Sequence, residues 1–208
     1  MGVTVMLLCD IGNTSVHFYD GRKNTKYLCN SFDFTSVTQE VYYINVHPEC
    51  ESQLQTLANW HDLRDLILWD NYYETMGIDR VVCCEAIDDG IVIDAGSAIT
   101  VDIVKKGKFE GGFIYPGVKN MQETFARLSS RLDLSFNLEL DLDKMPKNST
   151  DAISYGFLRT LKSEVERHSG IIYLTGGDAN ALAFLFANVV VKENLIFEGM
   201  IKILERRC

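Results

Sequence analysis

The feature that most constrains this chain is a short motif that occurs twice, about eighty residues apart. The copies are Leu7–Thr14, which reads LLCDIGNT, and Val92–Ala98, which reads VIDAGSA. Each copy is an apolar, strand-like run that ends in Asp-x-Gly and a small polar residue. A second apolar stretch follows each copy and ends near a glycine, Gly21 in the first case and Gly107 in the second. Two hairpins with an aspartate and a glycine at their tips are suited to bind a phosphate chain from two sides. The duplication therefore predicts two related α/β halves, a ligand cleft between them, and nucleotide chemistry.

Composition and charge exclude several classes of protein. The chain has 208 residues, enough for one large or two small domains, and 47% of them are hydrophobic. The net charge of −9, with scattered Lys and Arg, argues against a nucleic-acid-binding surface. No apolar run approaches the roughly 18 residues of a membrane span, and the first apolar run stops at Asp10, unlike a secretory signal. We therefore expect a cytoplasmic protein that binds neither nucleic acid nor membrane.

The six cysteines and four histidines show no metal motif. Cys29, Cys50 and Cys208 are far apart, no Cys-x-x-Cys occurs, and the adjacent pair Cys83–Cys84 is poorly placed to bind one tetrahedral metal. The histidines are widely separated as well. We therefore expect structural or incidental thiols in a reducing compartment, and no histidine metal site.

Hydrophobic periodicity predicts the order β-β-β-α-β-α in the first half and β-β-β-α-α-β-α in the second. The expected strands are residues 3–9, 15–20, 41–46, 66–69, 91–94, 100–105, 111–114 and 171–174. The expected helices are residues 52–62, 81–87, 118–132 and 150–169, one from residue 178, and one that ends at 206. Thr150 and Asp151 are expected to cap the helix 150–169. Asp88-Asp89-Gly90 is a strong turn signal, so we predict two domains, 1–87 and 88–208.

The first copy of the motif has the chemistry of a phosphate site. Asp10 comes directly before the turn, where its carboxylate points towards a ligand rather than stabilising the turn. A carboxylate among phosphates acts mainly through a cation, and Mg²⁺ bound partly through water is the usual arrangement. Gly12 lets backbone N–H groups approach phosphate oxygens, and Asn13 and Thr14 add donors. An ordinary hairpin turn is the alternative, and the second copy at Asp94 disfavours it.

A different candidate group is Gly77-Ile78-Asp79-Arg80. Asp79 is suited to act as a general base, and Arg80 to bind a substrate carboxylate through the bidentate geometry of guanidinium. The alternative is that Asp79 caps a helix and Arg80 lies on the surface. On these residues alone, both interpretations stay open.

Two glycine-rich segments are weaker candidates. Residues 111–117 form a strand-turn-helix junction where glycine permits the close approach of a ligand or the partner domain. Residues 175–178 form a strand-to-helix junction where a nucleoside can lie against bare backbone. Ordinary turn chemistry explains both equally well.

Five motifs, in order along the chain, resemble those of type III pantothenate kinases. They are Asp10–Thr14, Gly77–Arg80, Asp94–Thr100, Gly111–Gly117 and Ser149–Ile153. The resemblance extends from Asp10 to about Asp178 and is greatest to the short, epsilonproteobacterial form of the family.

This resemblance implies two duplicated ribonuclease H-like α/β domains of the actin-like ATPase type, found in acetate and sugar kinases, Hsp70 and actin, with ATP in the cleft. It implies a kinase that transfers the γ-phosphate of ATP to the 4′-hydroxyl of pantothenate, the first step of coenzyme A biosynthesis. It also implies Mg²⁺, a monovalent cation (K⁺ or NH₄⁺), and a homodimer with the pantothenate pocket near the subunit interface. The alternatives are another small-molecule, sugar-type kinase of the superfamily, and a non-catalytic ATP-binding regulator.

The resemblance also implies roles for single residues. Asp79 would be the catalytic base, Arg80 would bind the pantothenate carboxylate, Asp94 would bind the monovalent cation, and Asp10 would organise Mg²⁺ through water. The implied ATP-binding residues are Asp10, Ile11, Gly12, Asn13, Thr14, Ser15, Val16, His17 and Ser97. The implied substrate-binding residues are Tyr73, Gly77, Ile78, Asp79, Arg80 and Thr150.

The sequence departs from the family pattern at three points. Ser97 stands where threonine is more frequent, which retains a hydroxyl. Residues 71–76 lack the proline of the family's Tyr-x-Asn-Pro type segment, so Tyr73 is our choice for the substrate-contacting tyrosine and Tyr72 is the alternative. The segment between Arg80 and Asp94 is also short.

Overall fold

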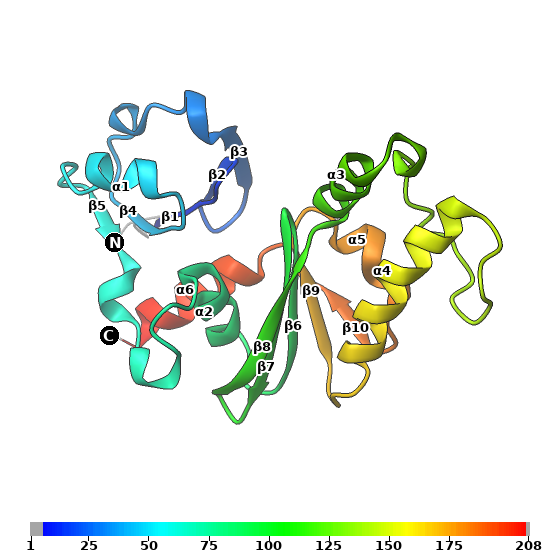
Figure 1. Cartoon of the computed structure of the whole chain (residues 1–208). Helices are drawn as coiled ribbons and strands as arrows, with labels where there is room; N and C mark the ends of the chain where they lie inside the picture. The colour runs from blue at the N-terminus through cyan, green and yellow to red at the C-terminus, as the bar shows by residue number, and fades with distance from the viewer. Residues whose placement is uncertain (1–5, 207–208) are drawn as a thin grey trace. The chain divides into compact units, whose positions relative to one another are not determined.

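The computed structural model describes residues 6–206, which pack as two compact units (Figure 1). The first unit contains the residues up to Ala86 together with those from Asn194 on, and the second contains Ile87–Glu193. No helix among the described residues is long and apolar enough to cross a membrane.

The first unit is built on a five-stranded sheet with the order β3-β2-β1-β4-β5. Its strands are β1 (Leu7–Ile11), β2 (Ser15–Tyr19), β3 (Asn24–Leu28), β4 (Val41–Asn45) and β5 (Trp60–Asp62). Strands β1, β2 and β3 pair antiparallel, while β4 and β5 continue the sheet in parallel with β1. Alternate residues of the central strands, such as Cys9, Ile11, Val16 and Phe18, are buried in one core.

The described part of the first unit also has three α-helices: α1 (Pro48–Leu54), α2 (Ile78–Glu85) and α6 (Leu195–Glu205). Helices α2 and α6 pack against each other. A Cβ atom on Gly199 would lie 1.9 Å from the backbone oxygen of Val82, so this contact requires glycine.

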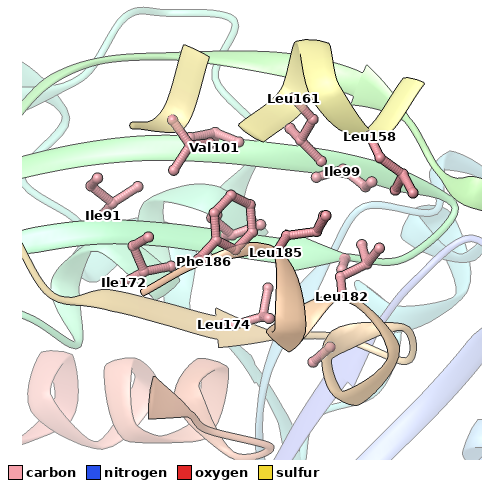
Figure 2. Packing of buried hydrophobic residues seen from close by; sticks show 14 of the residues in the cluster. Ile91, Ile99, Val101, Leu158, Leu161, Ile172, Leu174, Leu182, Leu185 and Phe186 are labelled. Atoms are coloured by element: carbon pink, nitrogen blue, oxygen red, sulfur yellow. The ribbon is translucent and has the colours of Figure 1, made fainter. Parts of the chain in front are cut away.

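The second unit has a five-stranded sheet with the order β10-β9-β6-β7-β8. Its strands are β6 (Gly90–Ala95), β7 (Ala98–Lys105), β8 (Lys108–Pro116), β9 (Ile172–Thr175) and β10 (Val189–Val191), and its helices are α3 (Val118–Leu128), α4 (Ser149–Val165) and α5 (Ala179–Leu182). Figure 2 shows its core, where Leu158 and Leu161 of α4 pack on Ile99 and Val101 of β7.

The two sheets repeat one topology. In each, a three-stranded antiparallel meander is extended by two parallel strands on the side of its first strand. Asp10 and Asp94 both occupy the next-to-last position of the central strand, β1 or β6. The repeated order confirms the predicted duplication of ribonuclease H-like α/β units.

Several predicted elements differ from the structure. The strand predicted at 66–69 is wrong, because the residues around it form the short 3-10 helices Leu63–Leu66 and Trp69–Asn71. The helix predicted at 52–62 is α1, which begins at Pro48 and ends at Leu54. Strands β3, β5 and β10 were not predicted, and two of them, β3 and β10, have few buried residues. All three lie at sheet edges; β3 carries no continuous apolar pattern, whereas β10 is a run of only three valines.

The capping of α4 and the division of the chain also differ. Asn148 caps α4, since its side chain accepts a hydrogen bond from the Asp151 N–H at 2.9 Å; Thr150 and Asp151 lie inside the helix. The predicted domain boundary between 87 and 88 stays a prediction. The packing units depart from it at the C-terminal end, because α6 packs on α2 and so belongs to the first unit.

Candidate active site

Asp10 lies in the middle of the first sheet, at the end of its central strand. It is opposite His17 of β2 and beside Ile44 of β4. Burial, and to a lesser degree the cross-strand Lys26, lower the pKa of His17 to about 4. The imidazole is therefore neutral at pH 7, so it contributes hydrogen bonding rather than positive charge.

The turn between β1 and β2 presents polar groups at its tip. The Gly12 N–H donates a hydrogen bond to the Ser15 carbonyl at 2.9 Å, and this closes the turn. Asn13 and Thr14 between them are exposed. Ser15 Oγ lies 3.0 Å from His17 Nε2. Exposed donors at a glycine turn are what a phosphate-binding loop needs.

Asp79 lies in the first turn of α2, close to the glycine that caps the helix. Its Oδ1 accepts a hydrogen bond from the Arg80 N–H at 2.9 Å. A Cβ atom on Gly77 would lie 2.4 Å from this Oδ1, so the position of the carboxylate requires a small residue there. Burial raises the pKa of Asp79 above its ordinary value, although the Arg80 N–H and guanidinium oppose the shift. A raised pKa makes the carboxylate a better proton acceptor near neutral pH.

Arg80 is buried, with 5% of its surface exposed. Its guanidinium donates a hydrogen bond to the Tyr73 hydroxyl and lies 5.8 Å from the centre of the Tyr73 ring. The alternative interpretation, in which Asp79 caps the helix and Arg80 lies on the surface, is therefore wrong, since Gly77 is the cap. A buried guanidinium beside an exposed aromatic ring is suited to bind a carboxylate.

The two tyrosines before this helix have different partners. The Tyr72 hydroxyl donates to Glu85 Oε1 at 2.9 Å, and Glu85 also pairs with Arg206 of the same unit. Burial raises the pKa of Tyr72 well above its ordinary value, and the neighbouring Glu85 carboxylate adds to the shift. Tyr73, by contrast, contacts Arg80 and has 45% of its surface exposed.

Asp94 in the second unit lies among oxygen atoms. It is opposite Thr100 of β7 and beside Thr175 of β9. A Cβ atom on Gly176 would lie 2.4 Å from both Asp94 Oδ1 and the Ala95 carbonyl, and Gly176 has φ +90°. The segment 175–178, a weak candidate in the sequence, thus places the backbone of Gly176, which has no side chain, directly against the Asp94 carboxylate.

The turn that carries Ser97 is held against the start of α3. The Ser97 carbonyl accepts hydrogen bonds from the Gly117 N–H at 2.9 Å and from Asn120 Nδ2 at 2.7 Å. A Cβ atom on Gly117 would lie 2.0 Å from the Gly96 carbonyl, so this approach depends on the glycine that ends the segment 111–117. The Ser97 side chain itself is exposed.

Thr150 lies in the first turn of α4, next to a network of polar side chains. Its carbonyl accepts a hydrogen bond from Ser154 Oγ at 2.7 Å. Asp151 accepts hydrogen bonds from Asn137 Nδ2 at 2.8 Å and Asn148 Nδ2 at 2.6 Å, and these lower the pKa of its carboxyl. The network orders the start of α4 around Thr150.

The structure thus distributes the predicted residues over both units. The first unit holds residues 10–17 and 73–80, and the second holds Asp94, Ser97 and Thr150. A pocket of about 430 Å³ in the second unit lies elsewhere, between β8 and α4. Two of its lining residues, Phe113 and Tyr115, belong to the weak candidate segment 111–117. The others, Arg159, Thr160, Ser163, Glu164 and Arg167, were not predicted as site residues.

One group of side chains was not expected from the sequence, which indicated incidental thiols and no histidine metal site. Cys29, His47 and Cys50 bring their sulfur and ring nitrogen atoms within 4.8 Å of one another. The sequence carries a signal for two of these three residues, because the spacing His47-x-x-Cys50 at the start of a helix places both side chains on one turn. Cys29 carried no signal, because only the pairing of strands brings it there.

Comparison with known proteins identifies the family. A family model of type III pantothenate kinases matches residues 65–169. A type III pantothenate kinase of Sulfurimonas denitrificans is 54% identical over 201 residues, which cover 97% of this chain and 98% of that protein. Another, of Campylobacter jejuni, is 38% identical over 96% of this chain and 97% of that protein.

Solved structures agree with this assignment. A Campylobacter jejuni protein assigned to the Baf family of transcriptional activators has a TM-score of 0.88 and 37% identity, over 97% of this chain and 98% of its own. A Sinorhizobium meliloti protein described as a 2-dehydro-3-deoxygalactonokinase has a TM-score of 0.61 at 9% identity, which shows the fold alone. The fold is the predicted duplication of ribonuclease H-like α/β units, and this neighbour shares it. With relatives this similar over nearly the whole chain, and all five motifs in place, the chain belongs to the type III pantothenate kinase family.

Proposed function

We propose that this protein transfers the γ-phosphoryl group of ATP to the 4′-hydroxyl of pantothenate, the first step of coenzyme A biosynthesis. Membership of the family supports the reaction. The structural observation that carries it is the start of α2, where the partly buried Asp79 lies beside the buried guanidinium of Arg80. The acceptor has a hydroxyl to be deprotonated and a carboxylate to be bound, and these two side chains supply the matching groups.

Phosphoryl transfer needs little covalent chemistry from the protein, so positioning and charge neutralisation supply most of the catalysis. Asp79 accepts the hydroxyl proton, for which its raised pKa suits it. Arg80 binds the carboxylate of pantothenate, and Tyr73 fixes the orientation of the guanidinium. Gly77 leaves room for the Asp79 carboxylate, while Ile78 and Thr150 complete the proposed substrate-binding set.

The turn between β1 and β2 binds the phosphates of ATP in this proposal. Asp10 to His17 supply the exposed tip, the backbone donors and a neutral imidazole, and Ser97 adds a hydroxyl. An oxygen ligand at the end of a strand fits Mg²⁺ held partly through water. Asp10 would hold that ion, which neutralises phosphate charge.

Asp94 would hold a monovalent cation, K⁺ or NH₄⁺. Gly176 approaches both the Asp94 carboxylate and the Ala95 carbonyl closely, so two oxygen donors lie beside the same piece of backbone. Large monovalent cations take oxygen ligands, and a mixed carboxylate and carbonyl set fits them. The ion would add positive charge near the phosphates.

We also propose that the enzyme acts as a cytoplasmic homodimer. The edge strand β8 supports a subunit contact, because Ile114 on it is 60% exposed.

The test is a coupled assay of ADP release with MgATP, pantothenate and K⁺. We expect turnover that depends on pantothenate and yields phosphopantothenate. Sugar acceptors added separately to the same assay test the sugar-kinase alternative, and ATP binding without turnover on any acceptor would favour a non-catalytic regulator. Absence of pantothenate-dependent turnover in K⁺ buffer would refute the proposal.

A further inference from the structure

A cluster of metal-binding side chains lies in the first unit, outside the residues used above. Cys29 is in a short 3-10 helix after β3, His47 precedes α1, and Cys50 is in the first turn of α1. The two Sγ atoms are 3.6 Å apart, and a His47 ring nitrogen lies within 4.8 Å of both. The cluster therefore combines two sulfur donors and one nitrogen donor.

Backbone hydrogen bonds hold the cluster together. The Cys50 N–H donates to the His47 carbonyl at 3.1 Å, which fixes these two residues on one turn. The Cys29 N–H donates to the Thr14 carbonyl at 3.1 Å, and the N–H of Val46, the residue before His47, donates to the Ile11 carbonyl at 3.0 Å. Both chain segments are thus anchored to the two ends of the turn between β1 and β2.

The distance between the sulfur atoms excludes a disulfide and fits both a hydrogen bond between two thiols and two ligands of one metal ion. A disulfide requires about 2.05 Å between sulfurs. Two thiolates on one tetrahedral Zn²⁺, each with a Zn–S bond of about 2.3 Å, are about 3.8 Å apart. The observed 3.6 Å between Cys29 and Cys50 is close to the second value.

His47 supplies an independent observation. Its Nδ1 is buried and has no hydrogen-bond partner among the described residues. Most buried polar atoms in folded proteins have a partner, because leaving one unsatisfied is costly. An imidazole nitrogen that faces a bound cation would meet this requirement.

We propose that Cys29, His47 and Cys50 bind one Zn²⁺, with a solvent molecule in the fourth position. Sulfur and imidazole donors select Zn²⁺ over the Mg²⁺ that serves ATP, which prefers oxygen ligands. The side chains close slightly from their separation of up to 4.8 Å when the ion enters. The ion links the residues after β3 to the start of α1. Because both segments are hydrogen-bonded to the ends of the turn between β1 and β2, the ion also makes this turn more rigid.

The test uses the full chain, purified with a phosphine reductant and stripped with a chelator. Titration with Co²⁺ reports thiolate ligation through a near-ultraviolet charge-transfer band, and tetrahedral geometry through visible d–d bands. We expect one equivalent to bind and Zn²⁺ to displace it. Because this readout needs no substrate, it is independent of the kinase activity proposed above.

Two variants make the assignment specific. Cys50→Ala should weaken Co²⁺ binding by more than about 100-fold, beyond the roughly 10- to 100-fold effect of losing an outer-shell partner. Cys84→Ala removes another buried thiol outside the cluster and should bind like the wild type. Circular dichroism of the stripped Cys50→Ala variant verifies that it folds. No thiolate band in the wild type, or equal zinc content in wild type and a folded Cys50→Ala variant, would overturn the proposal.

Discussion

Replacing Asp79 with asparagine should lower activity and raise stability together. Asparagine has nearly the same shape and keeps an oxygen that accepts the Arg80 N–H hydrogen bond. It cannot take a proton, so kcat should fall by roughly 10²–10⁴, the usual contribution of general-base catalysis. At about 1.36 kcal/mol per factor of ten, this is about 2.7–5.4 kcal/mol of transition-state stabilisation.

The effect on stability follows from the direction in which the pKa moves on folding. Burial raises the pKa of Asp79 in the folded protein above the unfolded value, and this outweighs its attraction to Arg80. At a pH above the folded pKa the carboxylate is charged in both states. Folding then carries the cost of burying it, about 1.36 kcal/mol for every tenfold difference between the folded and unfolded acid dissociation constants. Asp79→Asn removes that cost. The stability gain should be largest at neutral pH and should vanish as the pH falls through the folded pKa towards the ordinary 3.8.

The measurement pairs steady-state kinetics with thermal unfolding over a range of pH. Wild-type kcat/KM should fall as acid protonates Asp79, since the base must be ionised. Asp143→Asn is the matched control, because that side chain is 92% exposed and should change neither quantity. The reasoning fails if Asp79→Asn keeps a kcat near that of the wild type, or unfolds at a lower temperature at pH 7.

Four further predictions rest on the described contacts. Tyr73→Phe should raise the KM for pantothenate about tenfold, because it loses a hydrogen bond to a charged group. Tyr72→Phe loses a hydrogen bond to the Glu85 carboxylate, so it should lower the unfolding free energy by about 1.5–3 kcal/mol and leave that KM unchanged. Asp94→Asn should abolish the dependence of the rate on K⁺; an unchanged ratio of rates in K⁺ and Li⁺ buffers would contradict the proposed cation site. Gly199→Ala should destabilise the protein by about 1–3 kcal/mol, since its Cβ would meet a backbone oxygen at 1.9 Å. Gly156→Ala in α4, with nothing within 4 Å, should stabilise it by about 0.5–1 kcal/mol in the same denaturation assay.

The parts of the fold that could be predicted are those whose own residues carry the apolar pattern. Strand β1 buries three of its five residues and β6 five of its six, and α4 buries Ile153, Phe157 and Leu161 at helical spacing. Strand β3 could not be predicted, because four of its five residues are exposed and only pairing with β2 makes it a strand. Local sequence does not encode such an edge.

The candidate site also has parts that the sequence predicts and parts that only the structure shows. The family motifs identified Asp79 and Arg80, yet the contact between Arg80 and Tyr73 depends on how the chain enters α2. The approach of Gly176 to Asp94 depends on the pairing of β9 with β6, across about eighty residues. The Gly176 contact joins strands distant in sequence and leaves no local pattern. The Arg80–Tyr73 contact spans only seven residues, but it depends on the irregular segment before α2, which has no hydrophobic periodicity.

Asp10 and Asp94 occupy the same strand position in the two units, yet their neighbouring residues differ, and we propose that they serve different ions for this reason. Asp10 has an apolar neighbour on the parallel side, Ile44, and a three-residue turn whose tip is exposed. Asp94 has Thr100 and Thr175 on either side and the bare backbone of Gly176 above it. Hydroxyl and carbonyl oxygens around a carboxylate suit a large cation with few waters, whereas an open turn suits a hydrated Mg²⁺ and phosphates. Neighbours, rather than strand position, therefore set the proposed roles, and exchange of Thr175 for an apolar residue should weaken the K⁺ dependence without affecting Mg²⁺.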